Sequence, residues 1–191
     1  MRKLPILIAV ILEFASGAEL EIRVYNTARV SASNLQRAAL VVDGLLRRAK
    51  IAATWIEVDP PAAATLPRLA CRAQRSITLR LLQSEPRELP SAALGYATLS
   101  ATSDDVTILI RRVMELARVQ EVEPGTLLGY VMAHEIVHVL LQRRTHGTMG
   151  LMADKWRARE FSLMRNYSLR FDVRDSARMR AALDGRACEN R

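Results

Sequence analysis

The chain has 191 residues, of which 50% are hydrophobic and 25% are charged. These values are typical of one globular domain with a sizeable core, and the sequence shows no internal repeat or low-complexity segment. The formal net charge of +8 is compatible with an acidic polymer, anionic lipid or nucleic acid as a partner.

The N-terminal residues have the order of a secretory signal peptide. Two basic residues precede an apolar run over Leu4–Leu12, and small residues lead to Ala18. This order predicts a signal peptide over residues 1–18 and an exported protein, periplasmic or secreted, whose single domain spans residues 19–191. Because Glu13 interrupts the apolar run, a buried N-terminal strand and an uncleaved anchor are alternatives. The run is shorter than a membrane span of about 20 residues, and we expect no transmembrane span in the mature chain.

The first half of the mature chain predicts a β-α-β unit. Alternating or branched apolar residues predict strands over Leu20–Tyr25 and Ile51–Val58. Between them, apolar residues at helical spacing predict a helix over Leu35–Ala49, with Ser31 or Ser33 as its N-cap. We expect the two strands to pair in parallel through a right-handed connection.

The remaining elements complete an α+β fold with a mixed, mostly parallel, twisted sheet and C-terminal helices. After a proline-rich loop, further strands are expected over Ser76–Leu82, Gly95–Ser100 and Val106–Ile110, the second of them at the sheet edge. Helices are expected over Arg111–Gln120, Thr126–Leu141, Trp156–Tyr167 and Asp172–Leu183.

All three histidines lie within thirteen residues, at His134, His138 and His146. His134 and His138 are four residues apart in the predicted helix, so their imidazoles lie on one face and can bind one cation. Zinc is well matched to neutral imidazole nitrogens in a tetrahedral site. Glu135 projects about 100° away from His134 and can accept a proton from water that the metal activates. This His-Glu-x-x-His pattern is the signature of zinc peptidases, and it predicts one Zn²⁺ ion with Glu135 as general base.

The predicted helix is apolar nearly all round, which indicates that it is buried. Buried histidines and a glutamate without partners would each cost on the order of 1 to 3 kcal/mol, whereas one cation satisfies them together. The alternative is a chance match, with core histidines hydrogen-bonded to backbone carbonyls.

A third ligand is expected after the helix ends. His146 follows a polar stretch and can fold back over the helix end, which leaves the fourth position to water. A simple polar role in a loop is the alternative for His146. Glu160, twenty-two residues beyond His138, is a rival third ligand, and Asp154 is a candidate acceptor for a ligand imidazole.

Cys71 and Cys188 are the only cysteines, so they cannot build a Cys-rich zinc site. In an exported chain they can form a disulfide that ties the C-terminal tail to the body, and two free buried thiols are the alternative.

From Arg143 to Arg191 the chain has twelve Lys or Arg against six Asp or Glu. Because these cations are interleaved with acids and apolar residues, a solvated helix face explains them at least as well as an anionic partner, and we predict no specific nucleic acid.

Three features together resemble the metzincin clan of zinc peptidases: His134-Glu135-x-x-His138, the downstream His146, and Gly150-Leu151-Met152 before Trp156. The resemblance is to its matrixin and archaemetzincin branches and to small exported bacterial metallopeptidase-like proteins. It implies a zincin-like domain with an active-site helix, three histidine ligands, and Met152 packed beneath the metal. It also implies that substrate lies as an extra strand along a sheet edge, here Tyr96–Ser100.

The chain departs from the clan pattern after His138. Seven residues separate His138 and His146, where the clan has five, and Gln142 stands where the clan has the glycine that lets the chain turn sharply. We therefore expect the turn later, around Thr145–Gly147. Met152 follows His146 more closely than is typical, and core filling is its alternative role.

These inferences predict a zinc-dependent endopeptidase that acts on a peptide or protein substrate with Glu135 as general base. Two other functions stay open. One is a zinc-binding module without hydrolytic activity, and the other is a basic envelope protein that binds anionic polymer or membrane. The sequence identifies neither the substrate nor the oligomeric state.

Overall fold

The computed structural model describes residues 18–58, 75–83, 93–99 and 104–184, and five strands in this part of the chain form one sheet. They are β1 (Ala18–Tyr25), β2 (Ile51–Glu57), β3 (Arg75–Leu82), β4 (Gly95–Leu99) and β5 (Asp104–Leu109), in the order β2-β1-β3-β5-β4. All neighbouring pairs are parallel except β4 with β5. The mixed, mostly parallel sheet and the edge position of β4 are thereby confirmed.

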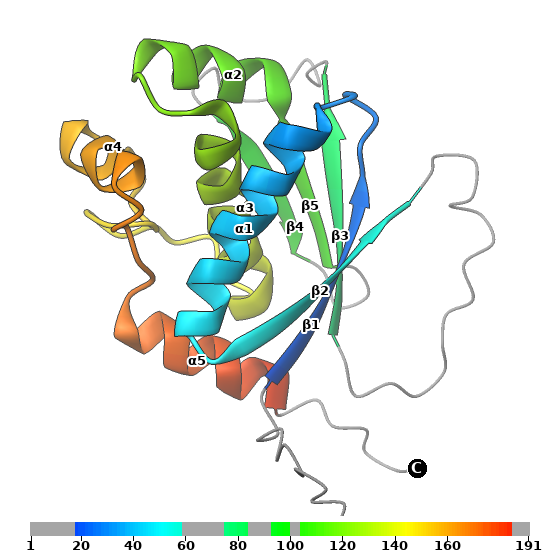
Figure 1. Cartoon of the computed structure of the whole chain (residues 1–191). Coiled ribbons are helices and arrows are strands. Elements are labelled where there is room, and N and C mark those ends of the chain that lie inside the picture. Colours follow the sequence, from blue (N-terminus) through cyan, green and yellow to red (C-terminus); the bar gives the residue numbers. More distant parts are fainter. Residues whose placement is uncertain (1–17, 59–74, 84–92, 100–103, 185–191) are drawn as a thin grey trace, which may run out of the picture.

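The helices are α1 (Ala32–Arg48), α2 (Ile110–Val119), α3 (Pro124–Leu141), α4 (Ala158–Arg165) and α5 (Val173–Asp184). They gather on one side of the sheet, with α1 and α3 nearest to the strands (Figure 1). The predicted α+β class is therefore confirmed.

Local hydrogen bonds explain where two helices differ from the predicted bounds. Helix α3 begins at Pro124, earlier than predicted, because the Glu123 carboxylate accepts hydrogen bonds from the N–H groups of Gly125 and Thr126. Proline suits the first helical position, where no N–H is needed. Helix α4 is shorter than predicted and does not include Trp156, because it begins after Arg157, whose N–H donates to the Glu160 carboxylate at 3.0 Å.

The β1-α1-β2 unit forms as predicted, with parallel register from Ala18 opposite Ile51 to Val24 opposite Glu57. Ser31 is the N-cap of α1 and accepts a hydrogen bond from the N–H of Asn34 at 3.4 Å. The apolar stripe of α1 is buried, as its helical spacing requires. Its members are Ala38, Val41, Val42, Leu45 and Leu46.

Helix α3 is the core of the domain, and all its residues from Gly125 to Leu140 are buried. It packs against α1, α2, α5 and the strands β4 and β5. A Cβ at Gly129 would lie 2.7 Å from the carbonyl oxygen of Ala38 and 2.7 Å from Cβ of Val41. Glycine at this position therefore allows α1 and the histidine-bearing helix α3 to pack closely against each other.

By length and composition alone, α3 would suit a membrane span, with a mean hydropathy of 1.2 over 18 residues. From the sequence we expect no such span in the mature chain. In the structure 89% of this stretch is buried inside the protein, which is the environment of a core helix. The apolar side chains of α3 pack against other elements of the same domain.

Two predictions concern residues outside the described ranges. They are most of the signal peptide over residues 1–18 and the pairing of Cys71 with Cys188. The cleavage and the disulfide therefore stay predictions.

Candidate metal centre

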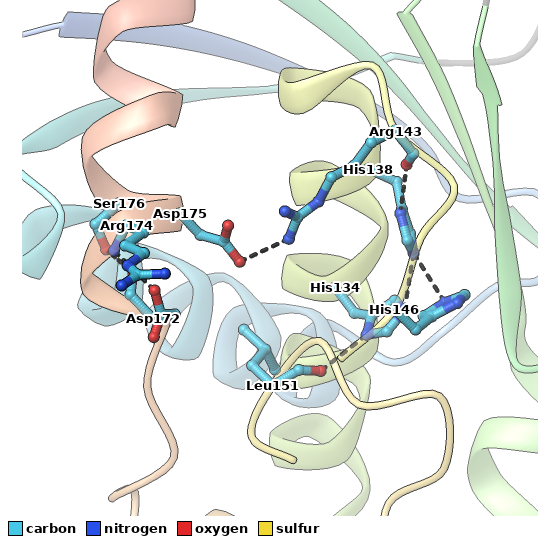
Figure 2. Close-up of polar contacts among 9 residues, drawn as sticks. All are labelled: His134, His138, Arg143, His146, Leu151, Asp172, Arg174, Asp175 and Ser176. Carbon is cyan, nitrogen blue, oxygen red and sulfur yellow. Dashed lines mark hydrogen bonds and ion pairs between the residues drawn. The ribbon is translucent and has the colours of Figure 1, made fainter. Parts of the chain in front are cut away.

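His134 and His138 lie one turn apart on α3 and point the same way, as their spacing predicts (Figure 2). Both side chains are buried, and their Nε2 atoms are 3.0 Å apart. The helix thus presents two ring nitrogens at one point on its surface.

The opposite ring nitrogen of each histidine contacts a backbone carbonyl. Nδ1 of His134 donates to the carbonyl oxygen of Leu151 at 2.8 Å, and Nδ1 of His138 donates to that of Arg143 at 2.7 Å. A carbonyl can only accept, so each Nδ1 carries a proton and each neutral ring presents the Nε2 lone pair to its neighbour. Burial lowers the pKa of His134 to about 4 and lowers that of His138 as well, which keeps both rings neutral near pH 7.

His146 joins the pair from the segment after α3. Its Nε2 atom is 3.1 Å from Nε2 of His138, and its ring stacks on that of His134 with centroids 5.2 Å apart. The potential ligand atoms of the three histidines all lie within 4.8 Å of one another. The fold-back of His146 over the helix end is therefore present.

The predicted place of the turn between α3 and His146 is wrong. We expect it around Thr145–Gly147, but the chain reverses at Gln142, which has the left-handed conformation φ 48°, ψ 43°. The N–H groups of Gln142 and Arg143 donate to the carbonyls of Val139 and His138, which ends the helix in the way a C-terminal glycine usually does. Gln142 also donates its side-chain amide to Val139 at 2.9 Å, a contact that glycine cannot make.

The three histidines fit a metal ion bound through nitrogen. Bonds of about 2.0 to 2.1 Å in tetrahedral geometry place ligand nitrogens about 3.3 Å apart. This is close to the 3.0 and 3.1 Å that separate Nε2 of His138 from Nε2 of His134 and from Nε2 of His146. Lone pairs at such separations repel unless a cation or a proton lies between them. Among the described residues no fourth His, Cys, Asp or Glu joins this group, so the protein ligands leave one tetrahedral position open.

Glu135 stands beside the histidines and faces the same cleft. Its side chain is buried, and among the described residues no hydrogen bond or ion pair engages its carboxyl. Burial alone raises the pKa of Glu135 to about 8. The structure therefore keeps an unpartnered carboxyl group next to the three imidazoles, which is unusual unless the group has a chemical role.

The cleft in front of these residues has a volume of about 1590 Å³. Its walls come from the loop after β1, the start of β4, helix α2 and the segment before α4. His134, Glu135 and His146 line it, and so does Trp156. The ring of Trp156 meets that of His134 edge to face at 5.7 Å, and it forms an apolar side of the site.

The rival ligand Glu160 has other partners. Its carboxylate accepts hydrogen bonds from the N–H of Arg157 at 3.0 Å and from that of Gly150 at 3.4 Å. These contacts cap α4 and fix the loop that carries Leu151. Asp154 lies 3.9 Å from Nδ1 of His146, near the ligand ring for which it is the candidate acceptor.

Met152 is buried in the loop that carries Leu151. Its carbonyl accepts a hydrogen bond from the N–H of Gly147 at 2.7 Å, which closes the loop just after His146. Core filling and a place beneath the metal both remain compatible with this position.

Arg75, at the start of β3, holds the C-terminal end of α3. Its buried guanidinium donates to the carbonyls of Val139 at 2.8 Å and Leu140 at 3.1 Å, and pairs with Asp104 of β5 at 2.6 Å. A cation at this place is favoured by the negative, C-terminal end of the helix dipole. The sequence gives no sign of this role for Arg75, because one arginine at the start of a strand is common and carries no distinct pattern.

No protein-family model matches the chain, and no curated protein matches it. Among solved structures, the archaemetzincin from Methanopyrus kandleri is similar, with a TM-score of 0.53 and 15% sequence identity. The match covers 91% of this chain and 99% of the archaemetzincin chain. At this identity the likeness shows the fold, and it confirms the archaemetzincin-like architecture that the motif residues imply.

Proposed function

We propose that this protein is a zinc-dependent endopeptidase. The observation that carries the proposal is the convergence of three imidazole Nε2 atoms beside an unpartnered, buried carboxyl group on the wall of a large cleft. This set of groups is what metal-assisted hydrolysis needs: nitrogen ligands, an open position and a base.

His134, His138 and His146 would hold one Zn²⁺ ion. When bound, zinc would supply a Lewis acid for water and for the substrate carbonyl, and its charge would favour the ionised form of Glu135. The Glu135 carboxylate accepts the proton of the attacking water and later delivers it to the leaving amine.

The edge strand β4 supports a position for the substrate. Among the described strands it pairs only with β5, in antiparallel fashion. The start of β4 lies against Glu135, since a Cβ at Gly95 would be 3.2 Å from Cγ of Glu135. A peptide added along β4 as a further strand would pass the carboxyl group, and its main chain would be recognised by main-chain hydrogen bonds.

Export is part of the proposal and rests on the order of residues 1–18.

The alternative of an anionic polymer or membrane as partner has less support, because several C-terminal arginines have partners within the fold. Arg143 pairs with Asp175, Arg165 donates to the carbonyl of Gln120, and Arg180 donates to that of Ala49.

A peptide-library assay tests the proposal. The zinc-loaded chain should cleave internal peptide bonds, lose this activity in a chelator, and regain it when zinc is restored. Absence of cleavage from a protein that holds stoichiometric zinc would support a binding module instead. Cleavage that survives removal of the metal would overturn the mechanism.

A further inference from the structure

Arg143 connects the C-terminal helix α5 to one of the candidate ligands. Its carbonyl oxygen accepts the Nδ1–H of His138 at 2.7 Å, and its own N–H donates to the carbonyl of His138 at 3.2 Å. Its guanidinium donates to Oδ2 of Asp175 at 2.7 Å (Figure 2). We propose that Asp175 is a positioning residue for the metal centre, because by holding Arg143 it fixes the carbonyl that orients His138.

Asp175 is itself held firmly. Asp172 caps α5, since its Oδ1 accepts a hydrogen bond from the N–H of Arg174 at 2.8 Å and its carbonyl accepts one from the N–H of Ser176 at 2.9 Å. Asp175 therefore lies in the first turn of α5, where the helix dipole stabilises a carboxylate. Its side chain is only 9% exposed, and α5 packs directly against α3.

The side chain of Arg143 depends on this carboxylate. The side chain of Arg143 is only 26% exposed, and its Nε atom has no hydrogen-bond partner. Without the Asp175 charge, a partly buried cation would be left unpaired and would be more favourable in water. Movement of the side chain toward solvent would displace the backbone of Arg143.

Displacement of the Arg143 backbone would affect both His138 and His146. His138 would lose the acceptor that sets its tautomer and ring orientation. Arg143 also begins the non-helical segment that carries His146 three residues later. Asp175 thus acts on the ligands through Arg143 and touches none of them itself. The inference rests on the proposed zinc site.

Zinc affinity is the first measurement, by competition of the full chain with a chromophoric chelator for Zn²⁺ alone. Asp175→Asn keeps the side-chain shape without its charge, and we expect about 10- to 100-fold weaker zinc binding. Asp175→Glu should recover most of the affinity. The double variant Arg143→Ala/Asp175→Ala should bind zinc about as weakly as either single variant, because both remove the same contact.

Asp172→Ala is the matched control, because it removes the carboxylate that caps the same helix and leaves the partner of Arg143 in place. It should lower the thermal stability of the chain but leave zinc affinity within about threefold of wild type. Equal loss of zinc affinity in Asp172→Ala and Asp175→Asn would overturn the proposal, since general loosening of α5 would then explain both.

A second readout needs no metal. In metal-free protein, ¹⁵N NMR of the imidazoles should show the His138 Nδ1–H signal shifted or lost in Asp175→Asn. The His134 signal should be unchanged, because its acceptor is Leu151. An unchanged His138 signal together with wild-type zinc affinity would overturn the positioning role. If the wild-type chain binds no zinc, the proposed function fails, and the His138 signal still decides whether Asp175 positions this ring.

Discussion

Gly95 on the edge strand β4 lies directly against Glu135 on α3. A Cβ at Gly95 would be 3.2 Å from Cγ of Glu135 and 2.7 Å from the carbonyl oxygen of Thr107 on β5. The second contact is with backbone, so no side-chain rotation can relieve it. The missing side chain at Gly95 therefore sets how closely the sheet edge approaches the proposed general base.

We predict that Gly95→Ala displaces β4 from Glu135. The variant should lose about 1 to 3 kcal/mol of stability through overpacking, and peptide cleavage should fall at least about tenfold because substrate strand and base are misaligned. Zinc content should be unchanged. Gly44→Ala is the control, because a Cβ there meets nothing within 4 Å. Full activity of Gly95→Ala would show that this close approach is not needed for catalysis.

Glu135→Gln should retain zinc and lose turnover. The amide keeps the shape of the carboxyl group but cannot accept the proton of the attacking water, so kcat should fall by about 10²- to 10⁴-fold. Steady-state cleavage of a peptide identified from the library, with metal content measured on the same sample, tests this expectation. Activity close to wild type in the zinc-loaded variant would reject Glu135 as general base.

The stability of the metal-free protein should depend on pH because of the buried carboxyl group of Glu135. Burial raises the pKa of Glu135 from 4.5 to about 8, so the folded state favours the protonated form. Protonated Glu135 therefore contributes to the free energy of unfolding. This contribution is fully present below pH 4.5 and is lost as the pH rises through about 8. Glu135→Gln cannot ionise, and its Tm in chelator should exceed that of wild type by about 2 to 6 °C above pH 8. The two Tm values should converge at low pH, and a difference that does not vary with pH would contradict this explanation.

Two alanine variants separate the candidate third ligands. His146→Ala should weaken zinc binding by at least about 100-fold, because only two imidazoles then remain to coordinate the ion. Glu160→Ala should keep zinc and lose about 0.5 to 2 kcal/mol of stability, because the α4 cap is removed. Metal affinity and thermal unfolding of both variants check this pair. The reverse pattern of zinc loss would make Glu160 the ligand.

Much of the fold follows from side-chain pattern. The stripe from Ala38 to Leu46 identifies α1, and the alternation around Ile77 and Leu79 identifies β3, because each burial pattern has the period of its element. The meeting of His134 with His138 follows from helix geometry alone.

The support around the histidines could not be predicted from residue types. Leu151 and Arg143 orient the rings through their backbone carbonyls, which every residue possesses. The turn at Gln142 uses a left-handed conformation that glycine usually adopts, so nothing in its side chain indicates the reversal. Asp175 reaches Arg143 across 32 positions of sequence, a separation at which only the packing of α5 on α3 decides the contact.

The central claim is that three imidazoles hold one zinc ion, and X-ray absorption at the zinc edge tests it most directly. A purified chain with one zinc per molecule should show three imidazole nitrogens at about 2.0 to 2.1 Å and one further light-atom ligand. Loss of one imidazole from this shell should accompany His146→Ala. A purified chain that retains no zinc at equimolar supply, or a zinc shell without imidazole nitrogens, would contradict the account.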